Sequence, residues 1–168
     1  MIFVTGGAGY IGSHCVLALL EKGYDVIIFD NLSTGHIEIA NKLKTYGKVD
    51  FIKADLHDSK SLEEIFSSNK IDAVMHFAAL SQVSESMQNP QKYFENNVLG
   101  TKSLLDAMIK NNIKKIVFSS TASIYGEPQY IPIDELHPQN PINPYGQTKL
   151  EIENILDEYD KKYDLKSI

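Results

Sequence analysis

Residues 4–12 read Val4-Thr5-Gly6-Gly7-Ala8-Gly9-Tyr10-Ile11-Gly12, and this stretch decides the fold. An apolar run at 2–4 precedes it, and a segment with helical periodicity, 11–21, follows it. Its glycines have the spacing G-x-x-G-x-x-G. In a strand–loop–helix unit, such glycines permit a tight turn, let backbone amides approach a diphosphate, and let the helix pack against the strand. The stretch therefore predicts a phosphate-binding loop between the first strand and the first helix.

The rest of the chain repeats this alternation of strands and helices. Apolar runs at 26–29, 49–52, 73–77 and 116–118 predict strands, and segments 36–45, 59–68, 91–112 and 146–163 predict helices. The strand runs are continuous, as expected of strands covered on both faces. The fold class is therefore α/β, a Rossmann-like doubly wound parallel sheet.

The end of the sequence bears on domain organisation. Residues 164–168 resemble the approach to a sixth strand, and no linker or repeat interrupts the chain. We therefore expect residues 1–168 to form one Rossmann-like domain, the N-terminal piece of a longer protein.

The composition excludes several classes of function. Lys plus Arg is 16 and Asp plus Glu is 22, which gives a net charge of −6. This balance argues against nucleic acid and anionic membranes as partners, and the longest apolar run, 15–20, is too short to span a bilayer. The single cysteine, Cys15, is compatible with a cytoplasmic location. The five histidines lack zinc-ligand spacing, so we expect no metal.

An acidic residue ends the second predicted strand. Asp30 stands where a carboxylate can accept hydrogen bonds from both hydroxyls of an adenosine ribose. The same carboxylate would repel a 2′-phosphate, and the sequence contains no arginine to neutralise one. The sequence therefore predicts NAD rather than NADP as the cofactor.

A tyrosine and a lysine are spaced for proton transfer. Tyr145 and Lys149 form a Y-x-x-x-K motif, so the two side chains share one face of a helix. A nearby cation favours the phenolate, which can take a proton from an alcohol while hydride leaves its carbon. Ser119-Ser120-Thr121 directly follows the fifth predicted strand, where a hydroxyl can bind the reacting oxygen.

These motifs resemble the extended short-chain dehydrogenase/reductase family and, within it, the UDP-glucose 4-epimerases. The resemblance spans the chain and rests on residues 5–14, 30–35, 76–79, 93–98, 118–126 and 144–149. It implies transient oxidation of a UDP-hexose at C4 by a resident NAD, which interconverts UDP-galactose and UDP-glucose. It also implies that residues 1–168 are the NAD-binding domain of a protein whose substrate domain would begin after Ile168. A homodimer built from helices 91–112 and 146–163 is a further implication.

The resemblance assigns roles to individual residues. Thr121, Tyr145 and Lys149 would be catalytic, with Thr121 and Tyr145 also contacting substrate. The residues expected to hold the cofactor, besides these three, are Gly6, Gly9, Tyr10, Ile11, Gly12, Asp30, Asn31, Leu32, Ser33, Thr34, Gly35, Asp55, Leu56, Phe77, Ala78, Ala79, Leu80, Ser81 and Asn96. From the sequence alone, Asp55 and Leu56 could equally begin a helix as its N-cap.

Three other functions stay open at this point. A nucleotide-sugar 4,6-dehydratase would need an acid–base pair, usually Asp-Glu, after Thr121, where this sequence has Ala122 and Ser123. An epimerase for another UDP-sugar fits the same motifs. A non-catalytic NAD-binding module would need neither Tyr145 nor Lys149. The chain by itself is expected to bind NAD without turnover.

Overall fold

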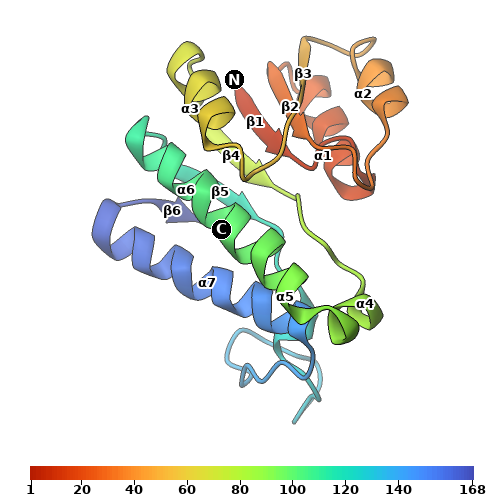
Figure 1. Cartoon of the computed structure of the whole chain (residues 1–168), viewed down its shortest axis with the longest axis vertical. Coiled ribbons are helices and arrows are strands. Elements are labelled where there is room, and N and C mark those ends of the chain that lie inside the picture. The colour runs from red at the N-terminus through yellow and green to blue at the C-terminus, as the bar shows by residue number, and fades with distance from the viewer.

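The computed structural model describes all 168 residues, and its centre is one parallel sheet (Figure 1). Six strands follow the order β3-β2-β1-β4-β5-β6. Their bounds are Ile2–Thr5 (β1), Val26–Asp30 (β2), Val49–Lys53 (β3), Ala73–His76 (β4), Lys115–Phe118 (β5) and Lys166–Ser167 (β6). The strand order reverses between β1 and β4, and ligands bind at such a switch point in open α/β sheets.

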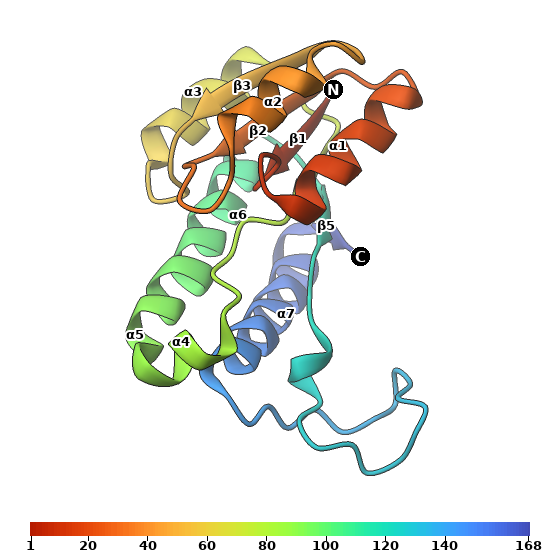
Figure 2. The same cartoon turned by 90° about the vertical axis from the view of Figure 1, so that its right-hand side faces the viewer.

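Helical segments connect the strands on both sides of the sheet (Figures 1 and 2). The helices are Tyr10–Glu21 (α1), Ile37–Leu43 (α2), Ser59–Ser68 (α3), Val83–Gln88 (α4), Pro90–Tyr93 (α5), Gly100–Lys110 (α6) and Pro144–Tyr163 (α7). A π-helical turn, Phe94–Leu99 (η1), joins α5 to α6, and a 3₁₀ turn, Ala122–Ile124 (η2), follows β5.

Two hydrophobic cores show that the sheet is doubly wound. Successive residues of a strand point to opposite faces, so Phe3 packs in one core and its neighbours Ile2 and Val4 pack in the other. The larger core lies under α3, α6 and α7, and the smaller lies under α1 and α2. The predicted fold class is therefore confirmed.

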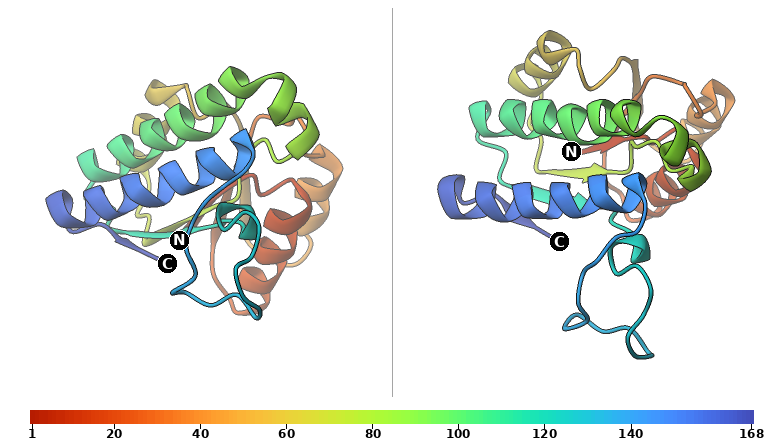
Figure 3. Two further views of the ribbon diagram at one scale, coloured as in Figure 1. Left: turned by 90° about the horizontal axis from the view of Figure 1, so that it is seen from below. Right: turned by 60° about the horizontal axis from the view of Figure 1, so that its bottom comes forward.

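The long segment between η2 and α7 extends away from the sheet (Figure 3). His137 is its buried anchor: its ring packs against Tyr125 and Tyr130, and its Nε2 accepts the amide of Gln129 at 2.9 Å. These contacts order a segment that is rich in proline and lacks regular secondary structure.

Several predictions about elements were wrong in detail. Residues 83–88 form a helix that was not predicted, and the single helix expected at 91–112 is three segments, 90–110, interrupted by the π-helical turn. The third strand is only partly covered on each face: β3 lies at the sheet edge, where Val49 is buried and Phe51 and Ile52 are half-buried. Ile11, the first residue of the predicted helical segment 11–21, does not pack in the core, because its side chain is 60% exposed.

Candidate functional site

One cavity opens at the carboxyl ends of the strands, beside the switch point. Its volume is about 420 Å³. Its walls come from the glycine loop, the end of β2, the turns after β2 and β3, the segment after β4, the π-helical turn η1, the residue after β5 and the start of α7. The residues lining it are Gly6, Gly9, Tyr10, Ile11, Gly12, Phe29, Asp30, Asn31, Ser33, Thr34, Ala54, Asp55, Leu56, Phe77, Ala78, Ala79, Leu80, Ser81, Asn96, Ser119, Tyr145 and Lys149.

The glycine loop has the close contacts that its spacing predicts. Gly6 has a φ of +67°, and a Cβ there would lie 2.7 Å from the backbone nitrogen of Ala78. A Cβ on Gly12 would lie 2.2 Å from the carbonyl oxygen of Gly6, so only glycine lets α1 begin this close to the loop. The amides of Tyr10, Ile11 and Gly12 find no acceptor within the protein.

Asp30 is buried beneath the loop with its carboxylate held in place. Its Oδ2 accepts the amide of Ala8 at 3.0 Å, and its Oδ1 accepts the amide of Leu32 at 2.8 Å. A Cβ on Gly35 would lie 2.9 Å from Oδ1, so this turn closes tightly around the carboxylate. Each oxygen keeps a lone pair for a further donor in the cavity.

Asp55 lies at the far end of the same wall. Its carboxylate accepts hydrogen bonds from the side chain of Asn31 at 2.8 Å and from the amide of His57 at 3.0 Å. Although desolvation opposes them, these bonds hold the pKa of Asp55 below its usual value. The alternative interpretation of Asp55 as a helix N-cap was wrong, because Asp58 caps α3.

Tyr145 and Lys149 share one face of α7 and line the opposite wall. The Lys149 Nζ lies 6.0 Å from the centre of the Tyr145 ring and donates to the carbonyl oxygen of Ser119 at 2.8 Å. Lys149 is only 3% exposed, and this desolvation lowers its pKa to about 8, against the opposing effect of Glu153. The ammonium is therefore largely charged at pH 7.

Two asparagines of the π-helical turn hold the wall formed by the segment after β4. Asn97 is buried, accepts the amide of Leu80 at 2.8 Å, and donates to the Leu80 carbonyl at 3.0 Å. Asn96 donates to Asn97 at 2.9 Å and itself lines the cavity. Because π-helical turns often occur at functional sites, this irregularity supports the assignment of the cavity.

His76 ends β4 but does not line the cavity. Its Nδ1 lies 2.6 Å from the hydroxyl of Thr5, and its Nε2 lies 2.8 Å from that of Thr101. Desolvation lowers its pKa to about 3, with a smaller contribution from Lys149. This environment fits a structural role for His76.

The structure brings most of the predicted site residues to this one cavity, and three predicted residues do not line it. Leu32 and Gly35 shape the turn around Asp30 instead of lining the cavity. Thr121 caps η2, where its Oγ1 accepts the amide of Ser123 at 3.2 Å.

Sequence reasoning missed two residues of the lining, Phe29 and Ala54, although their positions at the end of β2 and just beyond the end of β3 could have indicated them. Ser119, which also lines the cavity, was expected to offer a hydroxyl to the reacting oxygen and was not assigned to the cofactor.

This sheet order, with a glycine loop at the switch point and a tyrosine–lysine pair across the cavity, defines a Rossmann-like protein of the short-chain dehydrogenase/reductase class. The chain belongs to the family whose model is described as GDP-mannose 4,6 dehydratase, which matches residues 3–168.

Named relatives narrow the comparison to epimerases. A UDP-glucose 4-epimerase of Halalkalibacterium halodurans is 52% identical over 167 residues, which is 99% of this chain and 48% of the relative. A UDP-glucose 4-epimerase structure from Bifidobacterium longum, in complex with NAD+ and UDP, matches with a TM-score of 0.95 and 40% identity. It covers 99% of this chain and 51% of that one.

A third similar protein is the UDP-Glc/GlcNAc 4-epimerase of Campylobacter jejuni, with a TM-score of 0.95 and 40% identity. The match covers 99% of this chain and 51% of that one. The chain thus spans about half the length of the relatives it matches.

No helix of the structure combines the length and the apolar character needed to cross a membrane.

Proposed function

We propose that this chain supplies the NAD-binding and proton-transferring parts of a UDP-hexose 4-epimerase, with residues 1–168 as its dinucleotide-binding domain. The observation that carries this proposal is that Tyr145 and Lys149 line the same cavity as the glycine loop and Asp30. The similarity to UDP-glucose 4-epimerases, one of them in complex with NAD+ and UDP, supports the choice of cofactor and of substrate class.

The glycine loop fits a diphosphate. Three adjacent amides, those of Tyr10, Ile11 and Gly12, lack an acceptor and belong to residues that line the cavity. They begin a helix whose positive end faces the same space, so an anion there would be bound by hydrogen bonds and by the helix dipole.

Asp30 fits the adenosine ribose of NAD. Its two oxygens each accept one backbone amide, which fixes the carboxylate and leaves lone pairs for the ribose hydroxyls. The negative charge disfavours a 2′-phosphate, and the chain contains no arginine. Asn31, Ser33 and Thr34 line the same end of the cavity.

Bound NAD would supply the oxidant, which accepts hydride from C4 of the sugar and later returns it to the other face of that carbon. Tyr145, as phenolate, would take the proton of the 4-hydroxyl in the first step and return it in the second. Lys149 would stabilise the phenolate through its charge. Thr121 does not line the dinucleotide cavity, but its hydroxyl hydrogen stays available for a sugar oxygen, because its Oγ1 accepts from Ser123.

The name of the matching family raises 4,6-dehydration as an alternative reaction. Elimination of water needs an acid and a base next to Thr121, and the chain places Ala122 and Ser123 there. These side chains cannot exchange a proton near neutral pH, so the site favours epimerisation. The hexose itself is left open, since one similar structure is named for both UDP-Glc and UDP-GlcNAc.

The proposal includes a homodimer formed through α6 and α7. These two helices lie side by side on one face of the molecule, as Figures 2 and 3 show. A cytoplasmic location is also part of the proposal, and the single cysteine is compatible with it.

Calorimetric titration of this chain with NAD and with NADP tests the proposal. We expect NAD to bind at least about tenfold more tightly, because one unfavourable charge contact costs about 1.4 kcal/mol or more. In Asp30→Asn the carboxylate charge is lost, so the ratio of NAD affinity to NADP affinity should fall. Equal affinity of the unmodified chain for both dinucleotides would contradict the proposed cofactor.

A further inference from the structure

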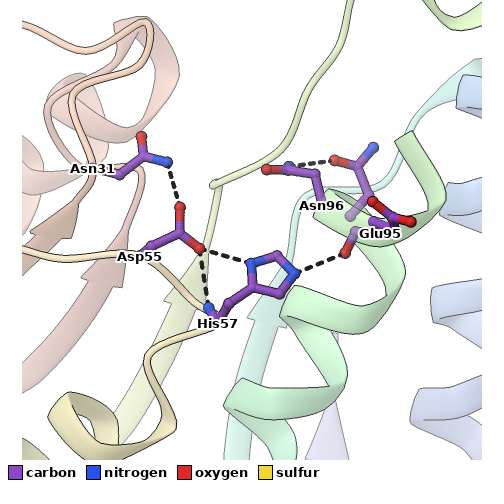
Figure 4. A network of polar contacts seen from close by, with 6 residues as sticks. Asn31, Asp55, His57, Glu95 and Asn96 are labelled. Carbon is purple, nitrogen blue, oxygen red and sulfur yellow. Dashed lines mark hydrogen bonds and ion pairs between the residues drawn. The ribbon is translucent and has the colours of Figure 1, made fainter. Parts of the chain in front are cut away.

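Three separate elements meet beside the adenosine end of the cavity, and His57 lies between them (Figure 4). The turn after β2 contributes Asn31, the turn after β3 contributes Asp55 and His57, and the π-helical turn contributes Glu95. The turn after β3 also packs closely on the start of α6: a Cβ on Gly100 would lie 3.6 Å from the His57 ring.

His57 contacts both neighbours through its ring. Its Nδ1 lies 2.7 Å from Asp55 Oδ1, and its Nε2 lies 3.1 Å from the carbonyl oxygen of Glu95. Both partners are acceptors, and each ring nitrogen donates to its neighbour when it carries the hydrogen. Figure 4 shows the ring spanning the space between the two elements.

The two contacts act on different walls of the cavity. On one side, His57 and Asn31 together fix both oxygens of Asp55, which lines the cavity. On the other side, the Glu95 carbonyl also accepts the amide of Gly100, the i to i+5 bond of the π-helical turn. That turn carries Asn96, a residue of the opposite wall.

The His57 ring and the Asp55 carboxylate are each nearly half exposed, at 49% and 45%. An ion pair at this exposure contributes little to global stability. The arrangement is therefore better suited to fixing the orientation of Asp55 than to holding the fold together.

We propose that His57 is a positioning residue that joins the π-helical turn to Asp55 and so aims this carboxylate at a hydrogen-bond donor on the bound nucleotide base. This inference rests on the proposed function. The base would be one with an exocyclic amino group at its edge, as in adenine, because a fixed carboxylate accepts from an amine and repels a carbonyl.

The test compares NAD with its hypoxanthine analogue, in which a carbonyl replaces the 6-amino group of adenine. Both are titrated calorimetrically into the unmodified chain, His57→Ala, His57→Gln and the control His36→Ala. His36 is exposed and makes no side-chain hydrogen bond in the structure. We expect His57→Ala to lose about tenfold in NAD affinity and much less in affinity for the analogue, since one charge-assisted hydrogen bond is misdirected.

The side chain in His57→Gln can make only one of the two contacts at a time, so this variant should show the same fall in the ratio of NAD affinity to analogue affinity. His36→Ala should keep the ratio of the unmodified chain. A loss shared equally by both dinucleotides, or no loss in either His57 variant, would overturn the inference.

Amide hydrogen exchange of the ligand-free chain separates this inference from the proposed function. In His57→Ala and in His57→Gln the amide of Gly100 should exchange about tenfold faster, because the turn loses its contact with the β3 side. Amides of α1 serve as the folding control. Unchanged protection of Gly100 would overturn the inference even if NAD binds, and failure of NAD to bind the unmodified chain would contradict the proposed function alone.

Discussion

At the scale of single residues, the site depends on a buried charge that the fold disfavours. Lys149 is almost fully buried, with Ser119 O as its only hydrogen-bond acceptor and Glu153 as the acidic residue that raises its pKa. The chain keeps an ammonium where an apolar side chain of similar size would pack with no desolvation cost. Such a cost is expected where a charge serves chemistry instead of stability.

The pKa of Lys149 shows how its charge changes the stability of the fold, and over which pH range. It is about 8 in the folded chain against 10.5 for the unperturbed group, so up to pH 8 the fold bears the full cost of keeping the charge. Between pH 8 and 10.5 the unfolded chain holds more protons than the folded one, so this contribution to stability rises with pH. The full cost of keeping this charge in the folded chain is roughly 3 kcal/mol of unfolding free energy.

We therefore expect Lys149→Met to be more stable than the unmodified chain at pH 7, by about 2 kcal/mol after loss of the lysine's hydrogen bond. This difference in unfolding free energy should be smaller at about pH 9.5, because the lysine of the folded chain is mostly neutral there. Denaturant unfolding at the two pH values measures it, with Lys161→Met, an exposed position of the same helix, as the control. A difference that stays constant with pH would show that the charge is not the cause.

At the scale of elements, the strand–loop–helix unit at the N-terminus divides its glycines between two tasks. A Cβ on Gly12 would overlap the backbone of the loop, 2.2 Å from Gly6 O. A Cβ on Gly9 would approach that same oxygen only to 3.3 Å, and the φ of Gly9, −85°, suits any residue. Both glycines line the cavity, but only Gly12 is required by packing.

The two alanine substitutions should separate these tasks. Gly12→Ala should lose about 2 kcal/mol or more of unfolding free energy, because α1 must move away from the loop. Gly9→Ala should keep nearly all its stability and lose NAD affinity, because its new methyl group occupies space in the cavity. Thermal unfolding and calorimetry on both variants measure the two quantities. A stability loss of the same size in both would refute this division.

The elements that the sequence predicted are those with strong local signals. The glycine spacing, the continuous apolar strands and the Tyr145–Lys149 pair each follow from a local pattern, and the structure places them around one cavity. α4 was missed because it is six residues long and begins without a side-chain cap. The π-helical turn was missed because residues 94–99 continue a helical pattern, and only tertiary contacts of Asn97 reveal the irregularity.

Within the site, the contacts that the sequence did not predict also lack a local sequence signal. The bond between His57 and Glu95 joins residues 38 positions apart, and no local pattern indicates it. Thr121 was expected to line the cavity. Its hydroxyl oxygen instead accepts the amide of Ser123 and so caps η2. Motif spacing indicates which residues approach one another, whereas side-chain direction depends on the turns that connect them.

At the scale of the whole molecule, the two faces of the sheet are covered unequally. α3, α6 and α7 bury one face along its length, whereas α1 and α2 pack mainly on β1, β2 and β3. On that second face Ala73, Met75 and Val117 are only half-buried. The cavity at the carboxyl ends of the strands has a volume of about 420 Å³, and the glycine loop and Asp30 assign this space to the dinucleotide.

A UDP-sugar brings two further phosphates, a uracil and a hexose, and the cavity walls offer its phosphates no arginine. We therefore expect this chain to bind NAD without converting UDP-galactose to UDP-glucose. Fusion to the C-terminal half of the Halalkalibacterium halodurans relative, which is 52% identical over the shared part, should yield an active epimerase. A coupled assay for UDP-glucose measures both, and substantial turnover by the chain alone would show that these walls suffice for the sugar nucleotide.

In that fusion, Tyr145→Phe keeps the aromatic ring and removes the proton acceptor. Turnover should therefore fall at least about 100-fold, the lower end of what a positioned acid or base contributes, while NAD still binds. The coupled assay measures the rate, and calorimetry with NAD shows that the cavity is intact. A Tyr145→Phe fusion that kept its rate would mean that another group of the site accepts the proton of the sugar hydroxyl.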